Sequence, residues 1–264
     1  MIENLGVNRY FDKQSDDLKI ARVMQKALLP SQSEIEQISQ SHKLSIACHS
    51  ESPDELAGDF WGVDVLDDDR IFIYIADFSG HGLSAALNTF RLHSIISIYG
   101  QEVQNNILSP ADYLGKLNRD LYALLPTEQY ATMLCGIVDL KRDVFTFAAA
   151  APTAPMKMTI GKPDILALDP SGIPLGMIED AAYEDRDIPF GKNEMLFFYS
   201  DALIESHNVN GELLGEEKFI DLCRETSVGL DPSAIFLDSF LKKFDHHVIR
   251  PLQDDLTAVT LTRG

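Results

Sequence analysis

The chain has 264 residues, and its 41 Asp and Glu against 22 Lys and Arg give a formal net charge of −19. Nucleic acid and anionic membranes are poor partners for such a chain, because phosphate binding needs clustered Lys and Arg. No apolar run approaches the about 20 residues of a membrane-spanning helix, and no signal peptide is visible at the N-terminus.

Three cysteines, Cys48, Cys135 and Cys223, lie far apart in the sequence. An odd number of widely spaced cysteines predicts reduced thiols rather than a disulfide framework, and hence a cytoplasmic protein. The sequence contains no CxxC or HExxH pattern of a zinc site.

The first predicted helix covers Asp16–Leu29 and ends before Pro30, which cannot continue a helix. Its apolar residues recur at helical spacing and form one stripe, made of Ile20, Val23, Met24 and Ala27. The helix either packs on the following domain or is a dimerising linker that forms an interface. Residues 31–42 are polar and predict a linker or a short solvated helix, so residues 1–42 are expected to be an N-terminal helical linker with a dimerising or regulatory role.

Strand patterns begin at Leu44 and come in blocks. The predicted strands are residues 44–49, 60–66, 70–76, 130–139, 144–150, 155–160, 164–168, 184–190, 195–200 and 256–261. The short polar segments between consecutive strands predict hairpin turns, at residues 67–69, 140–143, 161–163 and 191–193.

Four further helices are predicted, in two pairs. The first covers Leu83–Tyr99, with Leu83, Leu87, Phe90, Ser94 and Ile98 on one face. The second is capped by Ser109 and Pro110, closed by Pro126, and has a stripe of Leu114, Leu117, Leu121 and Leu124. The third covers Gly215–Thr226, and the fourth is capped by Asp231-Pro232-Ser233, with a stripe of Ala234, Leu237, Leu241 and Phe244.

The order of these blocks is a sheet, two helices, a series of hairpins, two helices and a last strand. Strict alternation of strand and helix is absent, which favours an α+β layered fold with antiparallel sheets covered by helices over a doubly wound parallel sheet. We expect one domain over residues 43–264.

Four aspartates stand where a strand-like run begins or ends: Asp59, Asp77, Asp201 and Asp254, with Asp255 next to the last. A single aspartate in such a place is usually a turn former or a helix cap. Several that converge would instead make an oxygen-rich site suited to Mg²⁺ or Mn²⁺.

Ordered motifs contain these aspartates. They are Leu28-Leu29-Pro30, Gly58-Asp59-Phe60, Asp77-Phe78-Ser79-Gly80-His81-Gly82, Gly172-Ile173-Pro174-Leu175-Gly176, Tyr199-Ser200-Asp201, Asn210-Gly211-Glu212-Leu213-Leu214-Gly215-Glu216-Glu217 and Asp254-Asp255-Leu256-Thr257. In order and spacing they resemble the metal-dependent PPM serine/threonine phosphatases, in particular the bacterial SpoIIE/RsbU branch. The resemblance extends from about Asp16 to Thr262.

The resemblance implies a β-sandwich of two antiparallel sheets flanked by helices, with a centre of two Mn²⁺ or Mg²⁺ ions at one end. By motif position, the metal ligands would be Asp59, Asp77, the carbonyl of Phe78, Asp201 and Asp254, with Asp255 in reserve. Asp77 would bridge the ions, and Asp59 and Asp77 would be catalytic through a metal-bound water. His81 would either donate a proton to the leaving group or hold the turn.

The sequence departs from the family pattern in three places. Ala202 replaces a glycine after Asp201, Trp61-Gly62 replaces a Tyr-Asp pair, and Ala149-Ala150-Ala151-Pro152 replaces an Ala-Gly-His-Pro segment. Two hypotheses therefore stand beside a phosphatase: an inactive pseudophosphatase that only binds its partner, and an acidic metal-binding scaffold whose resemblance is misleading.

The resemblance also implies partners. The substrate would be a phosphoserine or phosphothreonine of a regulatory protein like a STAS-type anti-sigma-factor antagonist. The N-terminal helix would support a homodimer or follow an upstream sensory or receiver domain.

Overall fold

The computed structural model describes residues 16–80, 82–105, 108–230 and 235–264. Their strands form two five-stranded sheets, in which all paired strands are antiparallel. Sheet A contains, in spatial order, β1 (Leu44–Glu51), β10 (Leu256–Arg263), β9 (Glu194–Tyr199), β6 (Met156–Thr159) and β7 (Ile165–Ala167). Sheet B contains β2 (Asp59–Val65), β3 (Arg70–Phe78), β4 (Ala131–Asp139), β5 (Val144–Ala150) and β8 (Arg186–Pro189).

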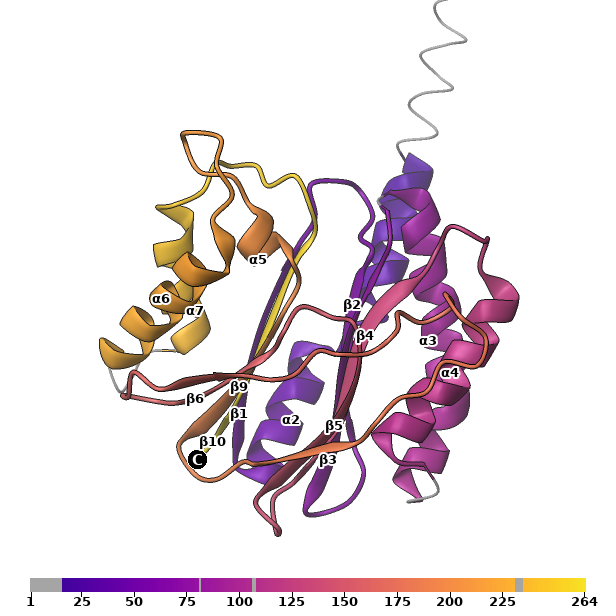
Figure 1. Cartoon of the computed structure of the whole chain (residues 1–264), viewed down its shortest axis with the longest axis horizontal. Helices are drawn as coiled ribbons and strands as arrows, with labels where there is room; N and C mark the ends of the chain where they lie inside the picture. The colour runs from indigo at the N-terminus through magenta and orange to yellow at the C-terminus, as the bar shows by residue number, and fades with distance from the viewer. Residues whose placement is uncertain (1–15, 81, 106–107, 231–234) are drawn as a thin grey trace, which may run out of the picture.

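Helices cover the outer faces of both sheets (Figure 1). The helices α3 (Leu83–Gln104) and α4 (Pro110–Leu124) lie on sheet B, and α5 (Ala202–Glu205), α6 (Gly215–Val228) and α7 (Phe236–Asp245) lie on sheet A. The expected α-β-β-α sandwich is therefore confirmed. None of the helices in the described ranges combines the length and the apolar character needed to cross a bilayer.

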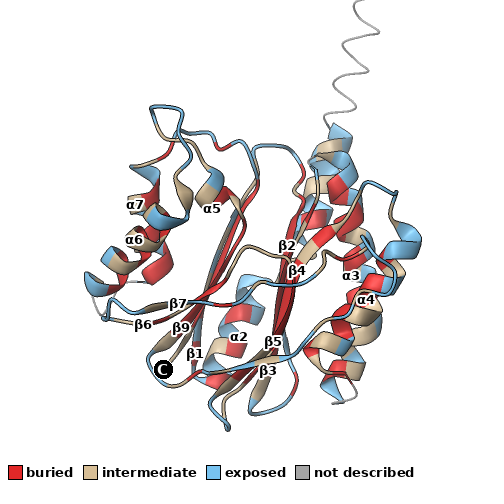
Figure 2. Cartoon of the chain, in the orientation of Figure 1, coloured by how far each residue is buried: buried red, intermediate tan, exposed pale blue. Residues whose placement is uncertain are grey.

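The buried side chains form three apolar layers, and the strands are mostly buried (Figure 2). β3 shows why, because its side chains alternate between two buried faces. Ile71 and Ile73 point into the layer between the sheets, whereas Phe72 and Tyr74 pack under α3 and α4. Two filled faces hold the ends of the central strands in fixed positions.

The N-terminal segment forms two helices, one over residues 16–26 and α2 (Gln32–His42). Ser31 caps α2 in a capping box with Glu34, and Ile35 and Ile38 are buried in the layer between the sheets. The expected linker or solvated helix is thus a helix packed on the sandwich.

The apolar stripe of the helix over residues 16–26 faces away from the sandwich. Ile20, Val23 and Met24 are 59%, 70% and 58% exposed. The stripe itself therefore does not pack on the domain, whereas the opposite side of the helix does, through Gln25.

The predicted face of α3 is also wrong. Leu83, Leu87 and Ile98 are each more than half exposed. The structure instead buries the opposite face, which contains Ala85, Ala86, Thr89, Leu92, Ile95 and Ile96. Apolar residues occur on both faces of this helix, so the stripe alone could not select the buried one.

The strands around residues 191–193 do not form the predicted hairpin. β8 pairs with β5 in sheet B, while β9 pairs with β10 and β6 in sheet A. The turn therefore carries the chain from one sheet to the other, past Phe190, which is buried between them. Of the helix predictions, Ser109 caps α4 as expected, whereas Asp231-Pro232-Ser233 and Ala234 lie outside the described residues.

Candidate metal centre

Asp59 and Asp77 lie opposite each other at one end of sheet B. Asp59 is the first residue of β2, Asp77 is the last but one of β3, and the two are cross-strand partners. Directly opposite residues of an antiparallel pair have Cβ atoms about 5 Å apart, so like charges there repel each other. Gly58 adds to this closeness, since a Cβ on it would lie 3.3 Å from the carbonyl oxygen of Phe78 and 3.5 Å from Oδ1 of Asp77.

Asp201 and Asp254 come from the corresponding end of sheet A. Asp201 follows β9 and begins α5, and Asp254 stands two residues before β10. Ser200 joins the two strand ends, because its hydroxyl donates to the carbonyl of Asp255 (3.0 Å) and accepts from the N–H of Thr257 (2.9 Å). The pairing of β9 with β10 thus brings two aspartates that are 53 positions apart in sequence to one place.

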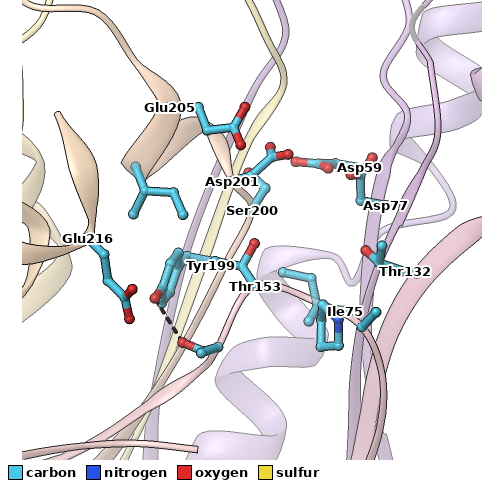
Figure 3. A pocket seen from close by; sticks show the side chains of 15 residues that line it. Asp59, Ile75, Asp77, Thr132, Thr153, Tyr199, Ser200, Asp201, Glu205 and Glu216 are labelled. Atoms are coloured by element: carbon cyan, nitrogen blue, oxygen red, sulfur yellow. Dashed lines mark hydrogen bonds between the residues drawn. The ribbon is translucent and has the colours of Figure 1, made fainter. Parts of the chain in front are cut away.

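A cleft of about 260 Å³ lies where the two sheet ends meet. Figure 3 shows the carboxylates of Asp59, Asp77 and Asp201 turned toward the space between the sheets. Glu205 and Glu216 add two more acidic side chains to its wall, and no Lys, Arg or His is among the described residues that line it.

Burial and mutual repulsion make these carboxylates hard to ionise. Burial, with the charges of Asp201 and Asp254, raises the pKa of Asp77 to about 8. Burial and Asp254 raise the pKa of Asp201 to about 6. Burial and Asp77 also raise the pKa of Asp59 well above its usual range, although the hydroxyls of Thr257 and Ser200 act in the opposite direction.

One oxygen of this set has no partner. Oδ2 of Asp59 is buried and makes no hydrogen bond. A buried unpaired carboxylate oxygen is costly unless a cation or a donor approaches it. Within the described ranges, no three His, Cys, Asp or Glu side chains already surround a single point. A Mg²⁺-type ion needs only one or two carboxylates with waters completing its shell, so the donor set fits hard divalent cations.

The adjacent Asp254 and Asp255 have different surroundings. Oδ2 of Asp255 accepts a hydrogen bond from the N–H of Gly58 (2.5 Å), which engages it with the loop before β2. Asp254 lies outside the lining of this cleft, in a neighbouring pocket beside Glu205. Besides burial, the charges of Asp254 and Asp255 both raise the pKa of Asp77; Asp254 also raises that of Asp201, and Asp255 that of Asp59.

The replacement of a glycine by Ala202 does not strain the backbone next to Asp201. Ala202 is the first residue of α5 and is not among the residues with a left-handed backbone, so no glycine is required there. Ala151 does have a left-handed φ of 51° and lines the cleft with a methyl group. His81 lies outside the described residues.

Sequence reasoning missed several residues of the cleft. Glu205, Glu216 and Tyr199 line it, and the hydroxyl of Tyr199 donates to the carbonyl of Ala154 (2.8 Å) and so holds the loop after β5. Tyr199 and Glu216 belong to motifs of the resemblance but had no role assigned to them, and Glu205 belongs to none of these motifs. The pairing of distant strands brings all three to the cleft, which the sequence could not show.

Comparisons with known proteins identify the family of the chain. The family model described as Stage II sporulation protein E (SpoIIE) matches residues 67–264. The chain is 26% identical over 254 residues to phosphoserine phosphatase RsbU of Bacillus subtilis, which covers 94% of this chain and 70% of RsbU. It is 27% identical over 198 residues to phosphoserine phosphatase RsbP of the same species, covering 72% of this chain but only 45% of RsbP.

Among solved structures, the SiaA-PP2C domain of Pseudomonas aeruginosa is similar to the whole described fold. Its TM-score is 0.82 at 21% sequence identity, with 97% of this chain and 98% of that chain covered. The likeness shows that the two chains share a fold.

Proposed function

The chain belongs to the SpoIIE family of PP2C-type (PPM) serine/threonine phosphatases, and on that premise we propose that it hydrolyses phosphoserine or phosphothreonine on a protein partner. The observation that supports the proposal is the cleft at one end of the sandwich, which Asp59, Asp77 and Asp201 line together, with Oδ2 of Asp59 unpaired and with Asp254 close enough to raise the pKa of Asp77 and Asp201. Since none of the described residues that line the cleft is cationic, these acids favour divalent metal ions over a phosphate group as the species bound.

The ligands of two Mn²⁺ or Mg²⁺ ions would be Asp59, Asp77, the carbonyl of Phe78, Asp201 and Asp254. Asp77 would hold metal together with ligands from both sheets, because it faces Asp59 on its own sheet and the charges of Asp201 and Asp254 act on it from the other. Asp255 is the weaker candidate, because its Oδ2 already accepts from Gly58. When bound, the ions supply positive charge to the phosphate oxygens and acidity to a water.

The chain's own side chains would hold the metal ions in place and shape the surroundings of the substrate. The described residues of the lining include no cysteine that could attack the phosphate, so we propose that water attacks it directly, without a covalent phosphoenzyme. They also include no cationic side chain that could bind the phosphate. Asp59 and Asp77 fix the ligand positions because both stand on paired strands with buried neighbours on each side. Glu205 and Glu216 keep the cleft wall acidic and so disfavour acidic segments next to the phosphorylated residue.

The physiological substrate we propose is a regulatory protein like a STAS-type anti-sigma-factor antagonist. Two relatives of the chain bear the name phosphoserine phosphatase, and the motif order has the same implication. The three free cysteines suit a reducing compartment, so we place the protein in the cytoplasm.

We also propose that residues 1–42 form a dimerising or regulatory segment ahead of a phosphatase domain over 43–264, in which an upstream sensory or receiver domain acts through this segment. The exposed stripe of Ile20, Val23 and Met24 supports this proposal, since a helix in water rarely leaves such a stripe uncovered.

Hydrolysis of p-nitrophenyl phosphate tests the activity. We expect turnover with Mn²⁺, none after EDTA, and a loss of at least about 100-fold in kcat for Asp77→Asn, because each metal-held charge contributes several kcal/mol. Asp68→Asn, in the turn between β2 and β3, is the matched control and should keep wild-type activity. Calorimetry with Mn²⁺ completes the test: metal binding without turnover on any phosphorylated substrate would favour the pseudophosphatase.

A further inference from the structure

A single glutamine ties the N-terminal helix to the loop that carries Asp59. Gln25 lies on the helix over residues 16–26, on the side opposite the exposed stripe, and is 9% exposed. Its side-chain amide bonds both polar groups of the Ala57 backbone: Nε2 donates to the carbonyl (2.7 Å), and Oε1 accepts from the N–H (3.0 Å). The amide thus pairs with this loop residue as a neighbouring strand would.

The same amide is anchored to α3. Nε2 of Gln25 also donates to the hydroxyl of Thr89 (2.9 Å), and that hydroxyl donates to the carbonyl of Ala86 (2.7 Å). Thr89 is fully buried, so it limits the rotamers that Gln25 can adopt. Gln25 therefore links three elements: its own helix, α3 and the loop before β2.

The loop is fully bonded at the two residues that precede Asp59. Gln25 bonds both backbone groups of Ala57. At Gly58, the N–H donates to Oδ2 of Asp255 (2.5 Å), and the carbonyl accepts from the N–H of Phe78 (3.4 Å). These four bonds fix the backbone that leads into Asp59. In three of them the partner is a side chain, of Gln25 or Asp255, where a regular strand would have the backbone of its neighbour.

Among these partners, Gln25 is the one that lies outside the sandwich. Arg22 also reaches the loop, one helical turn earlier, through an ion pair with Glu55 (3.6 Å). Both side chains of that pair are about two-fifths exposed, so it contributes little. The polar contacts that attach the helix to the loop therefore depend mainly on Gln25.

We propose that Gln25 is a positioning residue for the metal ligand Asp59, so that the N-terminal helix sets the affinity of the cleft for divalent metal. The proposal rests on the proposed function. Removing the amide leaves both backbone groups of Ala57 without partners and lets the loop move, which spreads Asp59 over several positions. Supporting groups around a metal ligand typically contribute about 10- to 100-fold in affinity, and we expect about 10-fold here because Gln25 acts two residues away.

Calorimetric titration of the full chain with Mn²⁺ tests this. Gln25→Ala should raise the Kd for Mn²⁺ about 10-fold, whereas the control Lys26→Ala, at the adjacent exposed position of the same helix, should keep the wild-type Kd. In assays, Gln25→Ala should need more Mn²⁺ for half-maximal activity and recover the wild-type kcat at saturating Mn²⁺. A purely structural role would lower thermal stability in EDTA without this shift in metal dependence.

A second pair of variants keeps the test decisive if Gln25→Ala does not fold. Thr89→Val removes the hydroxyl that anchors the amide, and Thr89→Ser keeps it, so only the valine variant should bind Mn²⁺ more weakly. If Gln25→Ala folds and binds Mn²⁺ with the wild-type Kd, the inference is overturned while the proposed function stands. If Gln25→Ala does not fold, a folded Thr89→Val with the wild-type Kd has the same consequence. A wild-type chain that binds no Mn²⁺ would overturn the proposed function as well.

Discussion

At the scale of single residues, two adjacent aspartates show how surroundings separate chemical tasks. Both charges raise the pKa of Asp77, but only Asp255, which is buried, also accepts a hydrogen bond from the backbone of Gly58. Motif position favoured Asp254 as the last ligand and kept Asp255 in reserve. The sequence could not show the bond between Asp255 and Gly58, because that loop lies 196 positions away from Asp254.

The two aspartates should respond differently to substitution. Asp254→Asn should weaken Mn²⁺ binding by more than about 10-fold, since it removes a ligand charge. Asp255→Asn keeps an acceptor for Gly58 and should change the Kd less. Asp255→Ala should lower the free energy of unfolding by about 1–3 kcal/mol, because the N–H of Gly58 loses its partner. Calorimetry and urea denaturation measure both effects; a larger loss of affinity in Asp255→Asn than in Asp254→Asn would reverse the assignment.

The raised pKa values of the cleft predict a pH dependence of stability without metal. The folded chain holds protons on Asp77 up to about pH 8 and on Asp201 up to about pH 6, whereas the unfolded chain releases them near 3.8. The folded chain therefore binds more protons over this interval, and these two groups lower the free energy of unfolding as the pH rises from about 4 to about 8.

Urea denaturation in EDTA at several pH values from 5 to 8 measures this dependence. Asp77→Asn cannot ionise at this position and should show a shallower fall than the wild type, while excess Mn²⁺ should remove most of the difference. An identical slope in both proteins would contradict the prediction.

At the scale of elements, the sequence predicts where a helix or strand lies better than it predicts which other elements that helix or strand packs against. The strands were predictable because runs such as Ile71–Ala76 are apolar throughout, as a strand buried on both faces must be. The aspartates at strand ends were predictable for the same reason, since they interrupt such runs. The buried face of α3 and the separation of β8 from β9 were not, because tertiary packing selects among local patterns that are equally apolar.

The end of α2 offers a test of local backbone strain. Lys43, its C-cap, adopts a left-handed conformation with φ of 53° and is exposed. Lys43→Gly should raise the free energy of unfolding by about 1 kcal/mol, since a Cβ disfavours this conformation by about 1–2 kcal/mol and glycine avoids the penalty. Chemical denaturation measures the change. Lys43→Ala retains the Cβ and serves as the control; an equal gain there would show that the backbone angle is not the cause.

At the scale of the whole molecule, the helix over residues 16–26 has two faces with separate tasks. One face holds the catalytic domain through Gln25, and the other exposes Ile20, Val23 and Met24. Contacts made on the exposed face would therefore act on the same rigid helix that positions the loop of Asp59.

We expect the chain to dimerise through the exposed face. Val23→Glu should shift sedimentation from dimer toward monomer at equal concentration, because a charge replaces an apolar side chain that is 70% exposed in the single chain. The melting temperature of the separated chain should change little, since the residue has few contacts in its own domain. Lys19→Glu, on the same helix, is the control, and a wild-type chain that sediments as a monomer at all concentrations would contradict the prediction.

The division of the four aspartates between the two sheets has a mechanical consequence. Asp59 and Asp77 move with sheet B, and Asp201 and Asp254 move with sheet A. If these four aspartates hold the metal ions as proposed, the thickness of the apolar layer between the sheets would set the distance between the two halves of the ligand set. A bulky side chain in that layer, such as Trp61, would then act as a spacer without contacting an ion. Evolution could retune metal selectivity here by changing filler volume, with every acidic residue left intact.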